Sequence, residues 1–168
     1  MLTNFDHVTH VVRDVEAAKH FFGLLGFVED KSVVIKGPTF SAYMGVDGIE
    51  AEHIRLALTG AMPRVEVQLL KYHHLEPLTN AETGSLRNIG YNHVCFAVDD
   101  LESEVARLTA EGVELRNEVM TFHGRKLVFL CGPEGTTVEL AEWNRSILST
   151  QRQPGGEDPE ASAEPAQS

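Results

Sequence analysis

The chain has 168 residues, 42% of them hydrophobic, which suits one globular domain or two half-domains that share a core. Its formal net charge of −11 argues against a nucleic-acid or anionic-membrane surface, because both partners require clustered Lys and Arg. The N-terminus lacks the pattern of a signal peptide, and no stretch approaches the roughly 20 apolar residues of a membrane span. We therefore expect a cytoplasmic protein.

Residues 1–72 predict one helix among four strands. Residues 5–12 (FDHVTHVV) alternate in polarity like a strand. Asp14 then opens a helix of about 14–24, and Gly26 suits the left-handed position that ends it. Three strand-like runs follow: FVEDKSVVI, HIRLALTG and RVEVQLLKY. We interpret the segment GPTFSAYMGVDG, which lies between the first two runs, as a glycine-bounded loop.

A linker at residues 73–90 separates this half from a second one at residues 91–146. The second half predicts the same order of elements: a strand at 91–98, a helix at about 100–110, and the runs VELRNEV, RKLVFLCG and TTVELAEW. The last residues, 147–168, are rich in Pro, Gly, Ala and Glu and have no apolar pattern, so we expect a disordered acidic tail. The chain is thus predicted to hold two tandem β-α-β-β-β modules.

The second module repeats the first at two fixed spacings. His93 lies 86 residues after His7. The same spacing relates three further pairs: Asp14 and Asp100, Glu16 and Glu102, Gly26 and Gly112. Glu139 lies only 71 residues after Gln68, because the first module has the longer middle. The repeated unit therefore carries two marked positions, a His on its first strand and a Gln or Glu on its last.

The marked residues share one orientation on their strands. Side chains alternate between the two faces of a strand, so residue parity shows which face each side chain occupies. Four marked residues fall opposite the apolar residues of their strands: His7, Gln68, His93 and Glu139. The apolar faces must meet the helices, so these four side chains are expected to line the surface around which the sheet curves.

The two cysteines, Cys95 and Cys131, each lie in an apolar strand pattern. They are expected to be reduced core thiols, as in a cytoplasmic protein. A catalytic thiol is the alternative for Cys95, because it lies two residues from His93.

The sequence resembles the vicinal oxygen chelate superfamily, which includes glyoxalase, methylmalonyl-CoA epimerase, fosfomycin-resistance enzymes and extradiol dioxygenases. The resemblance covers nearly everything from Phe5 to Trp143 and rests on FDHVTHVV, GYNHVCFAVDDLE, VQLLKY and GPEGTTVEL. It implies an α+β fold in which the two modules form a cupped, mostly antiparallel sheet around a divalent metal ion.

The resemblance also implies four protein ligands for one metal ion: His7, Gln68, His93 and Glu139. Two imidazoles, a carboxylate and an amide oxygen suit Co²⁺, Mn²⁺, Ni²⁺, Zn²⁺ or Fe²⁺. Two positions of an octahedron then stay open for waters or for two neighbouring substrate oxygens. Gln68 has an alternative role, because an amide is a poor ligand and can instead orient a bound water.

This ligand set is nearest to that of methylmalonyl-CoA epimerase, which moves a proton through an enolate. A metal that binds a carbonyl oxygen makes the neighbouring proton easier to remove. The epimerase family uses a glutamate on its third strand as a base, and this chain has His53 at that position. The expected catalytic base is therefore either His53, since an imidazole suits proton transfer near neutral pH, or Glu139.

Substrate-binding residues are expected from two segments. Arg55 shares a strand face with His53 and is suited to bind a carboxylate or phosphate. The glycine-bounded insert adds three side chains that either close over a substrate or pack on a second subunit: Phe40, Tyr43 and Met44. The linker is long enough for the modules to pair within one chain or between two chains, and we expect a homodimer.

The resulting prediction is a divalent-metal-dependent isomerase or lyase that acts through a metal-stabilised enolate on a small carbonyl, carboxylate or thioester substrate. The first alternative is an Fe²⁺ extradiol-type ring-cleaving dioxygenase, because His7, His93 and Glu139 without Gln68 form a two-His-one-carboxylate triad. The second alternative is a thiol transferase or a small-molecule binding protein of the drug-resistance type. Neither a nucleic acid nor a membrane is an expected partner.

Overall fold

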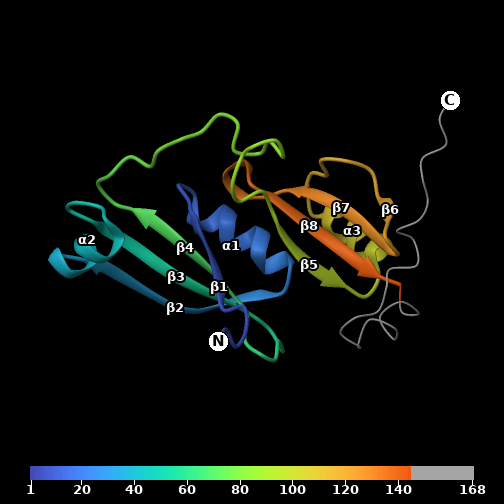
Figure 1. Ribbon diagram of the computed structural model, residues 1–168, viewed down its shortest axis with the longest axis horizontal. Helices are drawn as coiled ribbons and strands as arrows, with labels where there is room; N and C mark the ends of the chain where they lie inside the picture. The colour runs from blue at the N-terminus through green and yellow to red at the C-terminus, as the bar shows by residue number, and fades with distance from the viewer. Residues whose placement is uncertain (145–168) are drawn as a thin grey trace. The chain divides into compact units, whose positions relative to one another are not determined.

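The structure is a computed structural model that describes residues 1–144 (Figure 1). The acidic tail predicted at residues 147–168 lies outside the described residues. The chain divides into two compact units: Met1–Asn88 with Gly132–Thr136, and Ile89–Cys131 with the residues from Thr137 onward. In the described part of the chain, no helix is long and apolar enough to cross a membrane.

The first unit holds one four-stranded sheet and two helices. Its elements are β1 (His7–Val11), α1 (Val15–Leu24), β2 (Phe27–Lys36), α2 (Pro38–Met44), β3 (Glu50–Leu58) and β4 (Glu66–Tyr72). The strands lie in the order β1-β4-β3-β2, with β1 parallel to β4 and the other neighbours antiparallel. Helix α1 contacts β2 and β4 and buries Phe21 and Phe22. Ile54 and Leu69 supply buried apolar side chains from the sheet.

The second unit is built in the same way. Its elements are β5 (Val94–Val98), α3 (Leu101–Ala110), β6 (Met120–Phe122), β7 (Arg125–Cys131) and β8 (Thr137–Trp143). The strand order is β5-β8-β7-β6, again with the first strand parallel to the last and the other neighbours antiparallel. Helix α3 buries Leu101 and Leu108 and contacts β8.

The turn η1 (Pro133–Gly135) lies between β7 and β8 in sequence but belongs to the first unit. The carboxylate of Glu134 accepts hydrogen bonds from the backbone N–H groups of Arg13 at 2.6 Å and Asp14 at 3.4 Å. It also forms an ion pair with the Arg13 guanidinium at 3.2 Å. Because the first N–H groups of a helix lack partners within the helix, this carboxylate stabilises the start of α1.

The two sheets confirm the predicted α+β class and the tandem β-α-β-β-β arrangement. Val8 pairs with Val67 across β1 and β4, and Val94 pairs with Val138 across β5 and β8. These partners are related by the same two spacings that relate the marked residues of the sequence. The helix boundaries also agree, since Asp14 accepts a hydrogen bond from Ala17 N–H at 2.9 Å and Asp100 accepts one from Ser103 N–H at 3.0 Å.

The insert of the first unit was wrongly predicted to be a loop, because it contains helix α2. Gly37 occupies the N-cap position, and Pro38 begins the helix, where its fixed φ is compatible with helical geometry. Gly45 ends the helix with a φ of 65°, a left-handed conformation that glycine adopts readily. The glycines and the proline were interpreted as loop residues, whereas they mark the two ends of a short helix.

The strand predicted at VELRNEV was also wrong in position. Residues 113–119 contribute only an isolated bridge between Leu115 and Leu130, and strand β6 begins at Met120. The side-chain oxygen of Asn117 accepts the N–H of Phe129 at 2.8 Å. A side chain therefore takes the place of a backbone acceptor, and the regular ladder is interrupted at this point.

The cysteines differ from the expected core thiols. Cys95 is exposed and Cys131 is partly exposed. Cys95 lies on the face of β5 that alternates with the half-buried Val94 and Phe96, so the apolar strand pattern did not indicate which face it occupies. Both thiols are free.

His10 lies on the buried face of β1 and is only 6% exposed. Its ring centre is 5.3 Å from that of Phe22, and its Nε2 atom has no hydrogen-bond partner. Burial lowers the pKa of His10 below its ordinary value, because desolvation disfavours the charged imidazolium. The native protein therefore holds this side chain in its neutral form.

The first prediction concerns the pH dependence of stability. The unfolded chain protonates His10 below about pH 6.5, whereas the folded chain resists protonation, so the free energy of unfolding should decrease as pH falls from 7 to 5. His10→Phe retains an aromatic ring and removes the titrating group, so it should lose less stability over this range. Urea denaturation at both pH values measures the difference, with His20→Phe on the exposed face of α1 as control. An equal loss in the His10→Phe and parent proteins would refute the role of His10.

The second prediction concerns the start of α1. Asp14→Ala removes the acceptor of the Ala17 N–H and should lower the free energy of unfolding by about 1 kcal/mol. Asp14→Asn should lose less, because its amide oxygen can accept the same hydrogen bond. Urea denaturation followed by circular dichroism checks both variants. Equal stability of the parent and the alanine variant would show that this cap contributes nothing.

Candidate functional site

The two repeated histidines are oriented in the same way by the residue that precedes each of them. His7 Nδ1 lies 2.6 Å from the carboxylate of Asp6, and His93 Nδ1 lies 2.7 Å from the side-chain oxygen of Asn92. When these oxygens accept the Nδ1–H of a neutral imidazole, the lone pair is on Nε2. A metal-binding histidine is usually held by such a hydrogen bond through its other ring nitrogen.

His93 and Glu139 lie together in the second unit. His93 Nε2 is 3.4 Å from a carboxylate oxygen of Glu139, which is only 8% exposed. The ring of Phe129 contacts the imidazole edge-on, with 5.2 Å between the ring centres. With the proton on Nδ1, the Nε2 lone pair and the carboxylate oxygen are two electron-pair donors side by side. A shared cation, or a proton on Nε2, stabilises such an arrangement.

Gln68 is held by hydrogen bonds on both sides of its amide. Its Nε2 donates to the Glu66 carboxylate at 2.9 Å, and its Oε1 lies 3.0 Å from His53 Nε2. A carboxylate only accepts hydrogen bonds, which fixes the amide orientation and makes His53 Nε2 the donor to Oε1. The lone pair of His53 is then on Nδ1, and Gln68 Oε1 retains a second lone pair.

Glu66 connects Gln68 to a chain of charged side chains on the sheet of the first unit. Arg64 donates to Glu66 at 2.6 Å and to Asp30 at 2.7 Å. Asp30 lies at the bulge of β2, where the register shifts between Glu29 and Lys31. Burial of Glu66 acts to raise its pKa, but the hydrogen bonds from Gln68 and Arg64 outweigh this effect and leave the pKa lowered.

Arg55, a predicted substrate-binding residue, belongs to this chain of side chains. Its guanidinium donates to Asp30 at 2.6 Å, and its buried Nε has no hydrogen-bond partner. Arg55 and His53 lie on the same face of β3, because residues two apart on a strand point to the same side. An anionic substrate group would therefore have to bind a guanidinium that already donates a hydrogen bond to Asp30.

The remaining predicted substrate-binding residues lie on α2: Phe40, Tyr43 and Met44. Helix α2 has no buried residue, and the side chain of Tyr43 is 83% exposed. These apolar side chains are therefore accessible on the first unit, and their contact with a substrate or a second subunit stays a prediction.

Cys95 pairs in register with Glu139 across β5 and β8. Partial burial, followed by the hydrogen bond and the negative charge of Glu139, raises the pKa of the Cys95 thiol to about 12. The thiolate is the nucleophilic form of cysteine, so this thiol is a poor nucleophile at neutral pH. The raised pKa therefore argues against the catalytic-thiol alternative, although the Cys95 side chain is itself exposed.

Within the described residues, three exposed or half-exposed carboxylates also form a close group: Asp100, Glu102 and Glu142. Lys126 Nζ lies 2.7 Å from Glu102 and 3.8 Å from Glu142. Glu142 also accepts the N–H of Leu101 at 2.8 Å, and Asp100 caps the same helix. A lysine and the start of α3 account for these carboxylates without a metal.

The structure places two predicted ligands in each unit, and a distance of 3.4 Å joins one of these pairs, His93 Nε2 and the Glu139 carboxylate. His93 and Glu139 lie in the second unit, and His7 and Gln68 lie in the first. In the first pair of strands, Gln68 is the register partner of Thr9, two residues along β1 from His7. Sequence reasoning missed the side chains that hydrogen-bond to the predicted ligands or to their neighbours: Asp6, Asn92, Glu66 and Arg64. The available signal was the repeat itself, which reads FDH in one module and YNH in the other.

A family model described as the Glyoxalase/Bleomycin resistance protein/Dioxygenase superfamily matches residues 6–129. The chain therefore belongs to this superfamily, which confirms the resemblance to vicinal oxygen chelate proteins. The match defines the superfamily and not one particular member of it. Glyoxalase I of Saccharomyces cerevisiae is 29% identical over 56 residues, which are 33% of this chain and only 17% of the yeast protein.

Solved structures support the same assignment. A glyoxalase family protein from Bacillus cereus superposes with a TM-score of 0.75 at 25% identity, and the match covers 84% of this chain and 95% of that one. The fosfomycin resistance protein FosX from Listeria monocytogenes, in complex with Mn(II) and sulfate, superposes with a TM-score of 0.54. Its identity is 17%, over 87% of this chain and 97% of FosX, so this likeness concerns the fold.

Proposed function

We propose that this protein is a divalent-metal-dependent isomerase or lyase that acts through an enolate on a small carbonyl, carboxylate or thioester substrate. One observation carries the proposal. His7 and His93 are both hydrogen-bonded through Nδ1 to the residue before them, which leaves Nε2 as the donor atom for a metal. His93 Nε2 already lies beside the Glu139 carboxylate. These residues fit a divalent cation in donor type and orientation.

The proposed ligands are His7, Gln68, His93 and Glu139, contributed by one chain or by two copies of it. The bound cation supplies positive charge that lowers the cost of removing a proton next to a carbonyl group. The Glu66 carboxylate accepts hydrogen bonds from the Gln68 amide nitrogen and from Arg64. The nitrogen of the Gln68 amide therefore faces Glu66, and its oxygen points away from Glu66. The identity of the cation is left open among Co²⁺, Mn²⁺, Ni²⁺, Zn²⁺ and Fe²⁺.

We propose His53 as the group that removes the substrate proton. Its Nε2 donates to Gln68, so Nδ1 is the atom that would take up a proton. Gln68 holds the ring in place and fixes its tautomer, as a hydrogen-bonded neighbour of a catalytic base commonly does. Glu139 is the less favourable base, because a carboxylate that binds a cation must first give up part of that bond.

The third prediction concerns metal content. Glu139→Ala should abolish both stoichiometric metal and activity, because it removes the only carboxylate from the proposed ligand set. Elemental analysis of the desalted protein, after loading with each candidate cation, measures the metal. Glu104→Ala on α3 removes a half-exposed carboxylate of the same unit, which pairs with Arg107, and should retain the metal. A Glu139→Ala protein with one equivalent of metal and full turnover would exclude this site.

The fourth prediction concerns proton transfer. Incubation of metal-loaded protein with 2-substituted acyl thioesters or α-keto hemithioacetals in D₂O should introduce deuterium at the α-carbon. His53→Ala should slow this exchange by roughly 10² if His53 is the base. His20→Ala, on the exposed surface of α1, should exchange at the parent rate. Mass spectrometry of the substrate gives the rate, and exchange unaffected by His53→Ala would move the role to Glu139.

The hydrogen bonds of Gln68 also favour a second candidate function. If the amide stays bound to His53 and Glu66, the remaining ligands are His7, His93 and Glu139, a two-His-one-carboxylate set suited to Fe²⁺ and O₂. An extradiol-type dioxygenase would hold stoichiometric Fe²⁺ after anaerobic purification and consume oxygen in the presence of a catechol. Oxygen uptake without any α-proton exchange would select this function over the first.

A further inference from the structure

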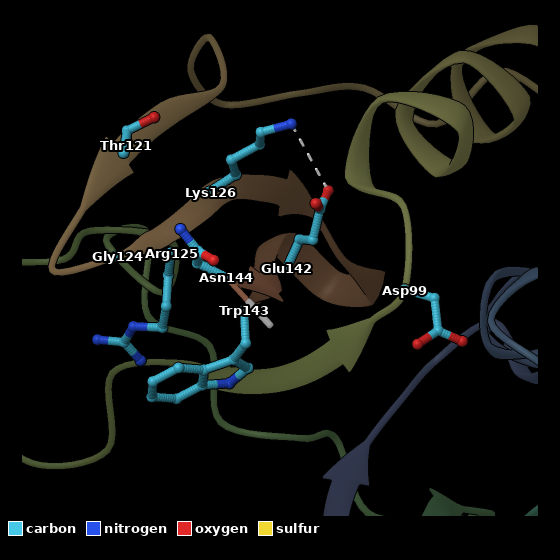
Figure 2. Close-up of a pocket in the computed structure, with 8 residues that line it drawn as sticks. All are labelled: Asp99, Thr121, Gly124, Arg125, Lys126, Glu142, Trp143 and Asn144. Atoms are coloured by element: carbon cyan, nitrogen blue, oxygen red, sulfur yellow. Dashed lines mark ion pairs between the residues drawn. The ribbon is translucent and has the colours of Figure 1, made fainter. Parts of the chain in front are cut away.

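A cavity of about 290 Å³ lies in the second unit, where β7 begins and β8 ends (Figure 2). Arg125 opens β7 and pairs in register with Trp143, the last residue of β8. Thr121, Lys126, Asn144 and the carboxylates of Asp99 and Glu142 also line this cavity. Figure 2 shows the Arg125 guanidinium beside the indole of Trp143.

Arg125 is an arginine without an acidic partner among the described residues. Its guanidinium carbon lies 4.6 Å from the centre of the Trp143 ring, and its Nε is buried without a hydrogen-bond partner. The neighbouring Lys126, in contrast, pairs with Glu102 and Glu142. In a chain with a net charge of −11, an arginine that keeps its charge unpaired beside a cavity is available to an external anion.

Arg125 and Trp143 lie on the same face of the sheet as Glu139. The register pairs Phe129 with Glu139, and four residues further along β8 it pairs Arg125 with Trp143. Residues separated by an even number of positions on a strand point to the same side. At the rise of a strand, Trp143 lies about 13 Å from Glu139 along β8.

We propose that Arg125 and Trp143 bind the anionic group of the substrate, a carboxylate or phosphate, at the far end of the molecule from the carbon that loses its proton. This inference rests on the proposed function, because Glu139 marks the reacting end. The substrate class is then an elongated organic anion on the order of 10 Å long, since the two groups are separated along one strand face. A small uncharged aldehyde would contact only the reacting end at Glu139 and would not reach Arg125 and Trp143.

The test uses the full-length protein without added metal and two planar anionic probes, phenyl phosphate and benzoate. Trp143 is the only tryptophan of the chain, so its fluorescence reports directly on this cavity. At least one probe should change the fluorescence saturably, and the stronger one identifies phosphate or carboxylate as the preferred group. Benzyl alcohol, which is planar but uncharged, should cause no saturable change.

Two charge-matched variants locate the binding site. Arg125→Gln should weaken probe binding at least tenfold, since a charge-assisted hydrogen bond contributes about 1.5–3 kcal/mol. Arg107→Gln removes an equal charge from α3. It should change the affinity less than about twofold, because salt screens the effect of a surface charge that does not contact the probe. Arg125→Lys should bind more weakly than the parent and more tightly than Arg125→Gln, because it keeps the charge and loses the planar fork. Circular dichroism confirms that each variant is folded.

The outcomes separate this inference from the proposed function. Glu139→Ala should retain probe binding. If the parent protein binds a probe through Arg125 but shows neither stoichiometric metal nor exchange activity, the proposed metal enzyme is refuted and the anion site stands. If the metal-dependent activity and the anion site are both present, Arg125→Gln should raise the KM for a substrate with a terminal carboxylate at least tenfold and change kcat less than threefold. The absence of saturable binding, or equal affinity in Arg125→Gln and the parent, would overturn the inference.

Discussion

The parallel pairing of the first and last strand of each module is the constraint on which the rest depends. It fixes Val8 against Val67 and Val94 against Val138, so that the histidine at the start of one strand shares a face with Gln68 or Glu139 on the next. A slip of one residue in either pair would turn these polar side chains to the helix side, where the buried core leaves no room for them. The apolar core therefore holds the polar face in register.

Orientation of the polar side chains comes from their neighbours on the same face. In the first unit, hydrogen bonds connect an arginine, a carboxylate, an amide and an imidazole in sequence: Arg64, Glu66, Gln68 and His53. In both modules the residue before the histidine supplies an oxygen to Nδ1. Such chains specify tautomers and amide orientations that packing alone would leave undetermined. Hydrogen bonding therefore fixes the orientation of these side chains in the absence of any ligand.

The fold could be predicted because the sequence contains an internal repeat, in which two modules share the same pattern of elements. Two spacings, strand parity and helix caps such as Asp14 gave the modules and the paired strands, and family membership agrees. The helix α2 was missed because it has no counterpart in the second module, and Gly37 and Pro38 define its start. The start of β6 was missed because the side-chain contact of Asn117 interrupts the ladder before Met120. The orienting roles of Glu66 and Asp6 depend on rotamers, and a single sequence does not show them. Whether Arg125 has an acidic partner depends likewise on which carboxylates the fold brings within its reach.

The turn η1 has a consequence for how this architecture can be divided. It is encoded between two strands of the second sheet, yet its Glu134 completes the start of α1 in the first unit. A single-module ancestor cut from this chain at the linker would leave the helix amides of α1 without that carboxylate and would need a second copy to provide it. In the fused chain the second half supplies this carboxylate to the first, so the segment around Glu134 and the start of α1 are constrained to change together in sequence.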